Sequence, residues 1–297
     1  MFLFAEGHHT PLIVEFVNTY LGEPVCRVEN GALYPALDMV LKPLGTSTVG
    51  VFGECHPDNA IPWYTIMFII ACLLTMAVIW IFKGKLSEDD PTHGQLTLEA
   101  GFLALKNLIV SVVGEHGYKY FPVVATFAVL ILISNLMGMF PLFMAPTASV
   151  SVTFALGITS FIYYNSVGIR ENGLIGHLAH FAGPRLPLLM AIFITPLIFG
   201  IELVSNMIRP LTLGVRLFAN MFADEAIAAT VSGLAPPYTQ FLVPVILLPL
   251  ALFVAFVQAF VFTLLSMVYL SEVSHGDHGH AGGHGEEAHG ETIAAHA

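Results

Sequence analysis

Long apolar runs dominate the chain, and short polar segments separate them. Five runs are at least close to the roughly 20 residues that an α-helix needs to cross the hydrocarbon core of a bilayer. They cover residues 61–82, 121–145, 148–167, 186–232 and 238–270. The pattern predicts an all-α, polytopic membrane protein with about five transmembrane helices.

The last two runs are longer than a bilayer is thick. Helices of that length must tilt in the membrane, or they must break near a proline. Four prolines offer such a place: Pro196, Pro210, Pro244 and Pro249. We expect two long, tilted helices, with a break at one of these prolines as the alternative.

The remaining segments are more polar. Residues 1–60 predict an extramembrane segment with one short amphipathic helix over 11–20. Residues 96–113 have an amphipathic pattern, which favours a helix lying on the membrane surface. The transmembrane domain would then span 61–271, and the Gly/His/Glu-rich tail, 272–297, is expected to be disordered.

Composition agrees with a membrane protein and excludes several functions. Of the residues, 56% are hydrophobic and 10% are charged, against roughly a quarter charged in an average soluble domain. The ten Lys and Arg residues form no basic cluster, which argues against a nucleic-acid partner. No H-E-x-x-H zinc signature, phosphate loop or nucleophile motif is present, so we expect neither an enzyme by itself nor a cofactor.

Basic residues predict the orientation. Six lie in two of the polar loops: Lys83, Lys85, Lys106, Lys119, Arg170 and Arg185. By the positive-inside rule both loops are cytoplasmic, which places the N-terminus outside. Five spans then place the C-terminus in the cytoplasm.

Cysteines and histidines leave two questions open. Cys26 and Cys55 lie in the same predicted extramembrane segment, so they could pair, whereas Cys72 falls within an apolar run. Six histidines lie in the Gly-rich tail. They could bind a divalent metal, or they could form a solvated tail whose charge changes weakly with pH; the irregular spacing favours the second reading.

Charged residues inside the apolar runs are concentrated in one place. Ionisable groups within a membrane are expensive and usually functional. The run 186–232 holds five of them together with two amides, and the final run adds a glutamine: Glu202, Asn206, Arg209, Arg216, Asn220, Asp224, Glu225 and Gln258. We infer that this helix carries the functional site.

Spacing arranges these groups around Arg216. Glu202, Arg209 and Arg216 are seven residues apart and share one helix face with Asn220. Glu225 lies about half a turn away in azimuth and roughly 14 Å along the axis, and Glu202 lies roughly 21 Å in the other direction. A central cation with a carboxylate towards each end suits two aqueous pockets that open to opposite sides of the membrane.

Arginine suits the central position because its guanidinium does not deprotonate. Such a charge lowers the pKa of a carboxylate brought close to it and blocks direct proton hopping. Two structural alternatives exist. Arg209 could reach the lipid headgroups, and Asp224 or Glu225 could neutralise Arg216 in a static bundle.

Several segments resemble a known family. Residues 205–221 read SNMIRPLTLGVRLFANM, which is similar to the signature of ATP synthase a subunits. Weaker matches are NLMGMFP at 135–141, PTASVSVT at 146–153 and QAFVF at 258–262. The resemblance covers about residues 121–271.

The resemblance implies specific roles. It assigns the essential, c-ring-facing arginine to Arg216, the outer half-channel to Asn220, Glu225 and Gln258, and the cytoplasmic half-channel to Glu202 and Ser205. It implies the c-ring and peripheral-stalk b subunits as partners and a bacterial cell membrane as the location. The expected function is proton translocation to and from the rotating c-ring.

The chain departs from the family pattern at two positions. The family commonly has Gly where this chain has Asp224, and many bacterial members have His where it has Ala251. We hypothesise that the titratable group has moved from one helix to its neighbour.

A secondary transporter with a charged midplane site is the alternative function. Such transporters are typically built from internal repeats with broken helices, and the sequence shows no repeat.

Overall fold

The computed structural model describes residues 11–41, 55–56, 60–84, 91–140, 143–180, 188–232 and 238–274. Within these ranges the regular structure is helical throughout and contains no strand. The predicted all-α fold is therefore confirmed.

The chain folds into eight α-helices and three shorter π- or 3-10-helical segments within the described ranges. In order, they are α1 (Leu12–Val28), η1 (Glu29–Leu33), α2 (Tyr34–Leu41), α4 (Trp63–Lys83), α5 (His93–Val113), η4 (Glu115–Tyr120), α6 (Phe121–Met137), η5 (Pro146–Ala148), α7 (Val150–His180), α8 (Leu188–Ser232) and α9 (Tyr238–Ser274).

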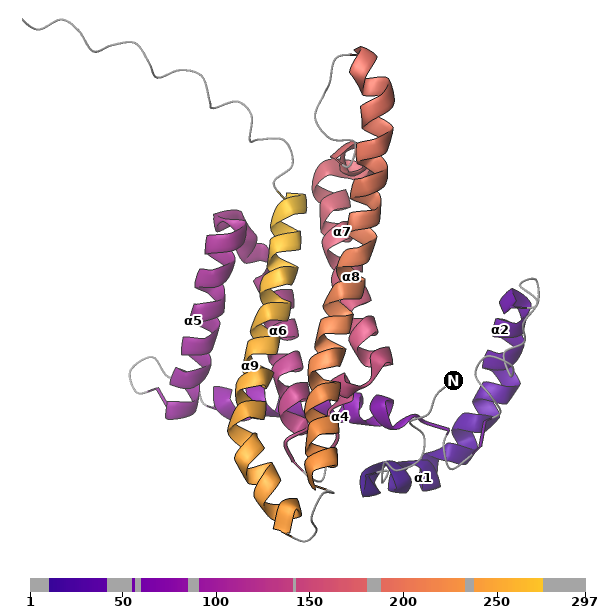
Figure 1. Cartoon of the computed structure of the whole chain (residues 1–297), viewed down its shortest axis with the longest axis vertical. Coiled ribbons are helices and arrows are strands. Elements are labelled where there is room, and N and C mark those ends of the chain that lie inside the picture. Colours follow the sequence, from indigo (N-terminus) through magenta and orange to yellow (C-terminus); the bar gives the residue numbers. More distant parts are fainter. Residues whose placement is uncertain are drawn as a thin grey trace, which may run out of the picture.

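Helices α6, α7, α8 and α9 run in roughly the same direction, whereas α4 runs across them (Figure 1). Helix α5 lies near one end of α4, and the arm formed by α1 and α2 lies near the other (Figure 1). One apolar cluster, which includes Ile109, Tyr164 and Met267, joins α5, α7 and α9. A second, which includes Ile131, Leu217 and Phe262, joins α6, α8 and α9.

Within the described part of the chain, six helical segments are long and apolar enough to cross a membrane. They are Trp63–Lys83, His93–Val113, Glu115–Met137, Val150–Gly173, Thr195–Ile227 and Val245–Val273. The chain is thus an all-α polytopic membrane protein. The sixth candidate is α5, which the sequence pattern assigns to the membrane surface.

Helices α8 and α9 continue through their prolines. Pro196 and Pro210 lie inside the 45-residue α8, so the predicted alternative of a break at a proline is wrong for the described residues. A helix of that length is about 68 Å long, more than twice the roughly 30 Å of the hydrocarbon core. It must therefore tilt strongly if most of it lies in the membrane.

Helix α7 extends further than the apolar pattern indicates. The sequence predicts a loop over 168–185, but α7 continues to His180 through a kink at Gly173, which has a φ of 70°. Distant partners satisfy its polar side chains. Glu171 accepts hydrogen bonds from Lys119 and Tyr120, and Asn172 donates to the backbone oxygen of Val273 at 3.0 Å.

Helix α6 ends at Met137 and not at residue 145, so it is shorter than predicted. The chain folds back immediately afterwards. A Cβ atom on Gly138 would lie 2.9 Å from the Cβ of Ala145, so the turn depends on the small residue.

The N-terminal helix α1 is also longer than the predicted 11–20, and it is fixed to the start of α4. The side chain of Asn18 donates to the backbone oxygen of Ile61 at 3.2 Å and accepts from its N–H at 3.1 Å. Asn18 is 4% exposed, so this pair of hydrogen bonds is shielded from water.

Cys26 and Cys55 form a disulfide with their Cα atoms 5.6 Å apart, which answers the question that the sequence leaves open. Cys72 is free, as expected.

The predicted tail falls mostly outside the described residues, as do its histidines. Helix α9 ends at Ser274, so the first residues assigned to the tail are helical.

Candidate ion-translocation site

Two glycines set the position of α8 against α7. A Cβ atom on Gly157 would lie 2.6 Å from the backbone oxygen of Pro210, and one on Gly214 would lie 3.1 Å from that of Thr153. The two backbones therefore touch beside Arg216. Leu213 and Leu217 flank Arg216 on the buried side of α8, at 2% and 0% exposed.

Arg216 itself lies on the exposed face of α8. Its neighbours Thr212, Val215 and Ala219 are exposed as well. Arg216 forms no ion pair or hydrogen bond with any other described residue. Among the described residues, neither Asp224 nor Glu225 forms an ion pair with Arg216. The structural alternative, in which one of them neutralises Arg216, is therefore not what the structure shows.

Helices α8 and α9 also carry many exposed apolar side chains. Large side chains on α8 and α9 are between 39% and 66% exposed: Ile201, Val204, Ile208, Leu211, Val215, Phe222, Phe253, Phe256, Val257 and Phe260. A permanent charge amid exposed apolar residues is unusual, because a charge is costly in a membrane unless a partner or water meets it.

On one side of Arg216, α8 and α9 share a polar contact. The Asn220 amide donates to the Gln258 oxygen at 2.5 Å. Gln258 is 2% exposed, and its side-chain nitrogen has no hydrogen-bond partner among the described residues. A buried donor without a partner is costly, so this nitrogen is suited to binding water or a passing polar group.

Further polar groups continue from this contact into α6 and η5. The Thr147 hydroxyl donates to the Asn135 oxygen at 2.8 Å, and the Asn135 amide donates to the backbone oxygen of Ala255 at 3.5 Å. Ala255 lies one turn before Gln258. The sequence analysis assigned no role to Asn135 or Thr147, although both are polar residues within family-like segments.

The two carboxylates on this side of Arg216, Asp224 and Glu225, are consecutive residues near the C-terminal end of α8. Glu225 is half-buried and lies against the backbone N–H of Ala145. Met221, one turn before Glu225, packs with Ala145 and Ala148. Asp224 is half-buried and forms no hydrogen bond or ion pair with another described side chain. We call Asn135, Thr147, Asn220, Asp224, Glu225 and Gln258 the first polar cluster.

A second polar cluster lies on the other side of Arg216 and is centred on Arg209. Its guanidinium donates to both oxygens of Glu272 at 2.5 and 2.8 Å and lies 3.5 Å from Glu202. It also lies over the ring of Tyr269, at 5.1 Å from the centroid. Arg209 is therefore paired with two carboxylates. Its side chain does not take the alternative course of extending to the lipid headgroups.

The second cluster continues into α7. The Tyr164 hydroxyl donates to the Asn206 side-chain oxygen at 2.7 Å, and the Asn206 amide donates to Asn165 at 3.3 Å. Ser205 is half-buried beside them. Glu272 could not be predicted from the apolar pattern, because it follows the last apolar run and belongs to the segment that the sequence assigns to the tail.

The predicted site residues thus divide into two groups with Arg216 between them along α8. Glu202 and Ser205 belong to the second cluster, and Asn220, Asp224, Glu225 and Gln258 belong to the first. The described residues contain no group of three or more His, Cys, Asp or Glu side chains arranged to hold a metal ion.

Fold and site together define a class: a polytopic helical membrane protein whose longest helix carries an unpaired arginine between two polar clusters. Comparison with known proteins identifies the family. The model of the ATP synthase A chain family matches residues 65–271, which is more than half of the chain. The chain therefore belongs to the ATP synthase A chain family, and the expected resemblance is confirmed.

Curated relatives agree with this assignment. The chain is 40% identical over 202 residues to ATP synthase subunit a 3 of Pelobacter propionicus, which covers 68% of this chain and 82% of the relative. It is 37% identical over 231 residues to ATP synthase subunit a of Geotalea daltonii, with 78% and 91% covered. The subunit a of Aquifex aeolicus is 36% identical over 211 residues, with 69% and 94% covered.

Proposed function

We propose that this chain is subunit a of an F-type ATP synthase and carries protons through two offset half-channels to and from a rotating c-ring. The observation that carries the proposal is Arg216, which lies between the two polar clusters on α8, is exposed and has no partner among the described residues. The exposed apolar side chains of α8 and α9 suit the helices of such a ring.

Protons would enter from outside through the first polar cluster. Asn220 and Gln258 join α8 to α9 there, and Glu225 and Asp224 offer titratable groups. The proton would neutralise a carboxylate on the ring, which can then turn into the lipid. The transmembrane potential supplies roughly 2.3 kcal/mol per charge per 100 mV.

Arg216 would act on the returning ring carboxylate. Since its guanidinium has no partner within the described chain, its charge is available to an acid that approaches from outside the chain. A nearby cation favours the ionised form of that acid, so the proton is released and leaves past Ser205 and Glu202. The same charge prevents protons from crossing directly between the half-channels.

The orientation follows from two observations. The positive-inside rule places the N-terminus outside. The Cys26–Cys55 disulfide supports this placement, because disulfides persist in oxidising compartments such as the bacterial periplasm. In a bacterial inner membrane the outer half-channel would therefore open to the periplasm.

Helix α5 would lie on the cytoplasmic membrane surface and not form a sixth span. The amphipathic pattern of residues 96–113 supports this placement, and α5 lies near the opposite end of α4 from the α1–α2 arm (Figure 1). Five spans with the N-terminus outside place the C-terminus in the cytoplasm. The c-ring and the peripheral-stalk b subunits would be the partners of the chain.

Reconstitution distinguishes this function from the transporter alternative. Vesicles with an imposed potential would contain the chain alone, the c-ring alone, or both, and a pH-sensitive dye would report proton flux. We expect flux only when both are present. Flux through the chain alone would contradict the proposal and favour a transporter.

A further inference from the structure

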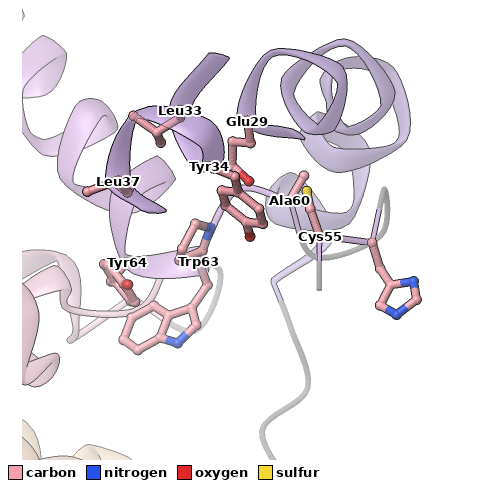
Figure 2. Close-up of a pocket in the computed structure, with 10 residues that line it drawn as sticks. Glu29, Leu33, Tyr34, Leu37, Cys55, Ala60, Trp63 and Tyr64 are labelled. Carbon is pink, nitrogen blue, oxygen red and sulfur yellow. The ribbon is translucent and has the colours of Figure 1, made fainter. Parts of the chain in front are cut away.

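A pocket of about 470 Å³ lies between the N-terminal arm and the start of α4. Its lining includes Glu29 at the start of η1, Tyr34 and Leu37 of α2, and Trp63 and Tyr64 of α4. Figure 2 shows side chains from both segments around it, with the Glu29 carboxylate next to the Tyr34 ring. No function described above uses this pocket.

The walls of the pocket are fixed by cross-links far apart in the sequence. Cys55, which lines the pocket, is bonded to Cys26 of α1. The two hydrogen bonds between Asn18 and Ile61 hold α1 against the residue that precedes Pro62, another lining residue. These cross-links connect the arm to the chain on the N-terminal side of α4, next to the cavity.

The chemistry of the lining favours a cation. Glu29 supplies a carboxylate, and Tyr34, Trp63 and Tyr64 supply aromatic rings. No Lys or Arg is among the described lining residues, and His56 is the one basic side chain there. Aromatic faces attract ammonium groups, and several rings around one site are the usual arrangement for substituted ammonium ligands. A carboxylate at the same site adds a charge-assisted hydrogen bond to a primary amine.

The position of the pocket favours an amine that is present at the membrane. Trp63 and Tyr64 are the first residues of the spanning helix α4, and such aromatic residues sit at the level of the lipid headgroups. We propose that this pocket binds an ammonium group and that its occupant is the amine headgroup of a membrane lipid.

Trp63 gives a direct readout of occupancy. The chain contains two tryptophans, and Trp80 lies near the far end of α4, so Trp80→Phe leaves the pocket residue as the single emitter. The full chain would be placed in phosphatidylglycerol nanodiscs with increasing fractions of phosphatidylethanolamine, and Trp63 emission would be followed. A second series would add free ethanolamine to discs of phosphatidylglycerol alone.

Matched variants separate the site from general lipid effects. Glu29→Gln removes the pocket carboxylate, Tyr34→Leu removes a ring, and Glu15→Gln removes an exposed carboxylate of α1 that does not line the pocket. Resistance of Cys26 and Cys55 to thiol labelling confirms that each variant retains the folded arm.

We expect a saturable change with phosphatidylethanolamine that Glu15→Gln retains and that Glu29→Gln and Tyr34→Leu weaken at least about tenfold. A saturable change with free ethanolamine of equal affinity would support the ammonium site but assign it to soluble amines. A non-saturable response, or one that Glu29→Gln leaves unchanged, would overturn the proposal.

Discussion

Arg209 and Arg216 lie seven residues apart on α8 but have different surroundings. Arg209 is held by Glu272 and Glu202 and lies over Tyr269, whereas Arg216 is exposed and unpaired within the described chain. Helix periodicity predicts a shared face for the two residues. It could not predict the difference, because the partner carboxylate of Arg209 comes from α9, 63 residues further along the chain.

The Arg209–Glu272 pair has a measurable structural role. Glu272→Gln removes one charge of a two-point contact, while Arg209 stays mostly covered at 16% side-chain exposure. We expect a loss of roughly 1 kcal/mol of stability, since Glu272 is partly exposed and solvent screens the pair. Thermal unfolding in detergent would measure it. A melting temperature equal to that of the exposed control Glu15→Gln would contradict the role.

Asp224 tests the hypothesis of a relocated titratable group. It is half-buried without a partner among the described side chains, as expected of a residue free to exchange protons. Asp224→Gly should lower proton-driven ATP synthesis by about tenfold, which is less than the hundredfold or more typical of losing a proton-transfer group, because Glu225 remains. Ala226→Gly introduces the same backbone change at an exposed neighbour. If Asp224→Gly left ATP synthesis intact, Asp224 would have no part in proton transfer.

At the scale of elements, the α7–α8 contact positions the site. The backbone oxygen of Pro210 occupies the space that a side chain on Gly157 would need. Gly157→Ala should separate the helices and cost about 1–3 kcal/mol, with reduced assembly of the complex. Gly200 also lies on α8, but a Cβ atom added there would meet no atom within 4 Å. Gly200→Ala should therefore leave the stability unchanged or raise it slightly. Equal melting temperatures would show that the close contact is unimportant.

The sequence predicts which elements exist better than it predicts where they end. Apolar runs locate α4, α6, α7, α8 and α9, because membrane-crossing helices need long apolar segments. The end of α7 at His180 was missed, since a polar segment becomes helical when distant residues satisfy it, as Lys119 and Tyr120 do for Glu171. Proline content could not show whether α8 breaks, because the close approach of Pro210 to Gly157 of α7 arises only in the folded chain.

At the scale of the whole molecule, the disulfide tests the orientation. The Cys26–Cys55 bond should be reduced by a membrane-impermeant phosphine in right-side-out vesicles and protected in inverted ones. Labelling with a large maleimide after reduction would count the released thiols, with Cys72 inside α4 as an internal reference. If the bond were reduced only in inverted vesicles, the proposed topology would be wrong. Each half-channel would then open to the opposite side of the membrane.

The central claim is that Arg216 acts on acids that approach from outside the chain. Its most direct test is gradient-driven ATP synthesis by complexes that carry Arg216→Ala, with the exposed Arg170→Ala as the matched control. Since the variant loses the only charge proposed to deprotonate the ring, we expect synthesis to fall at least about a hundredfold while the complex still assembles and the control remains active. Synthesis at the control rate in Arg216→Ala would contradict the account.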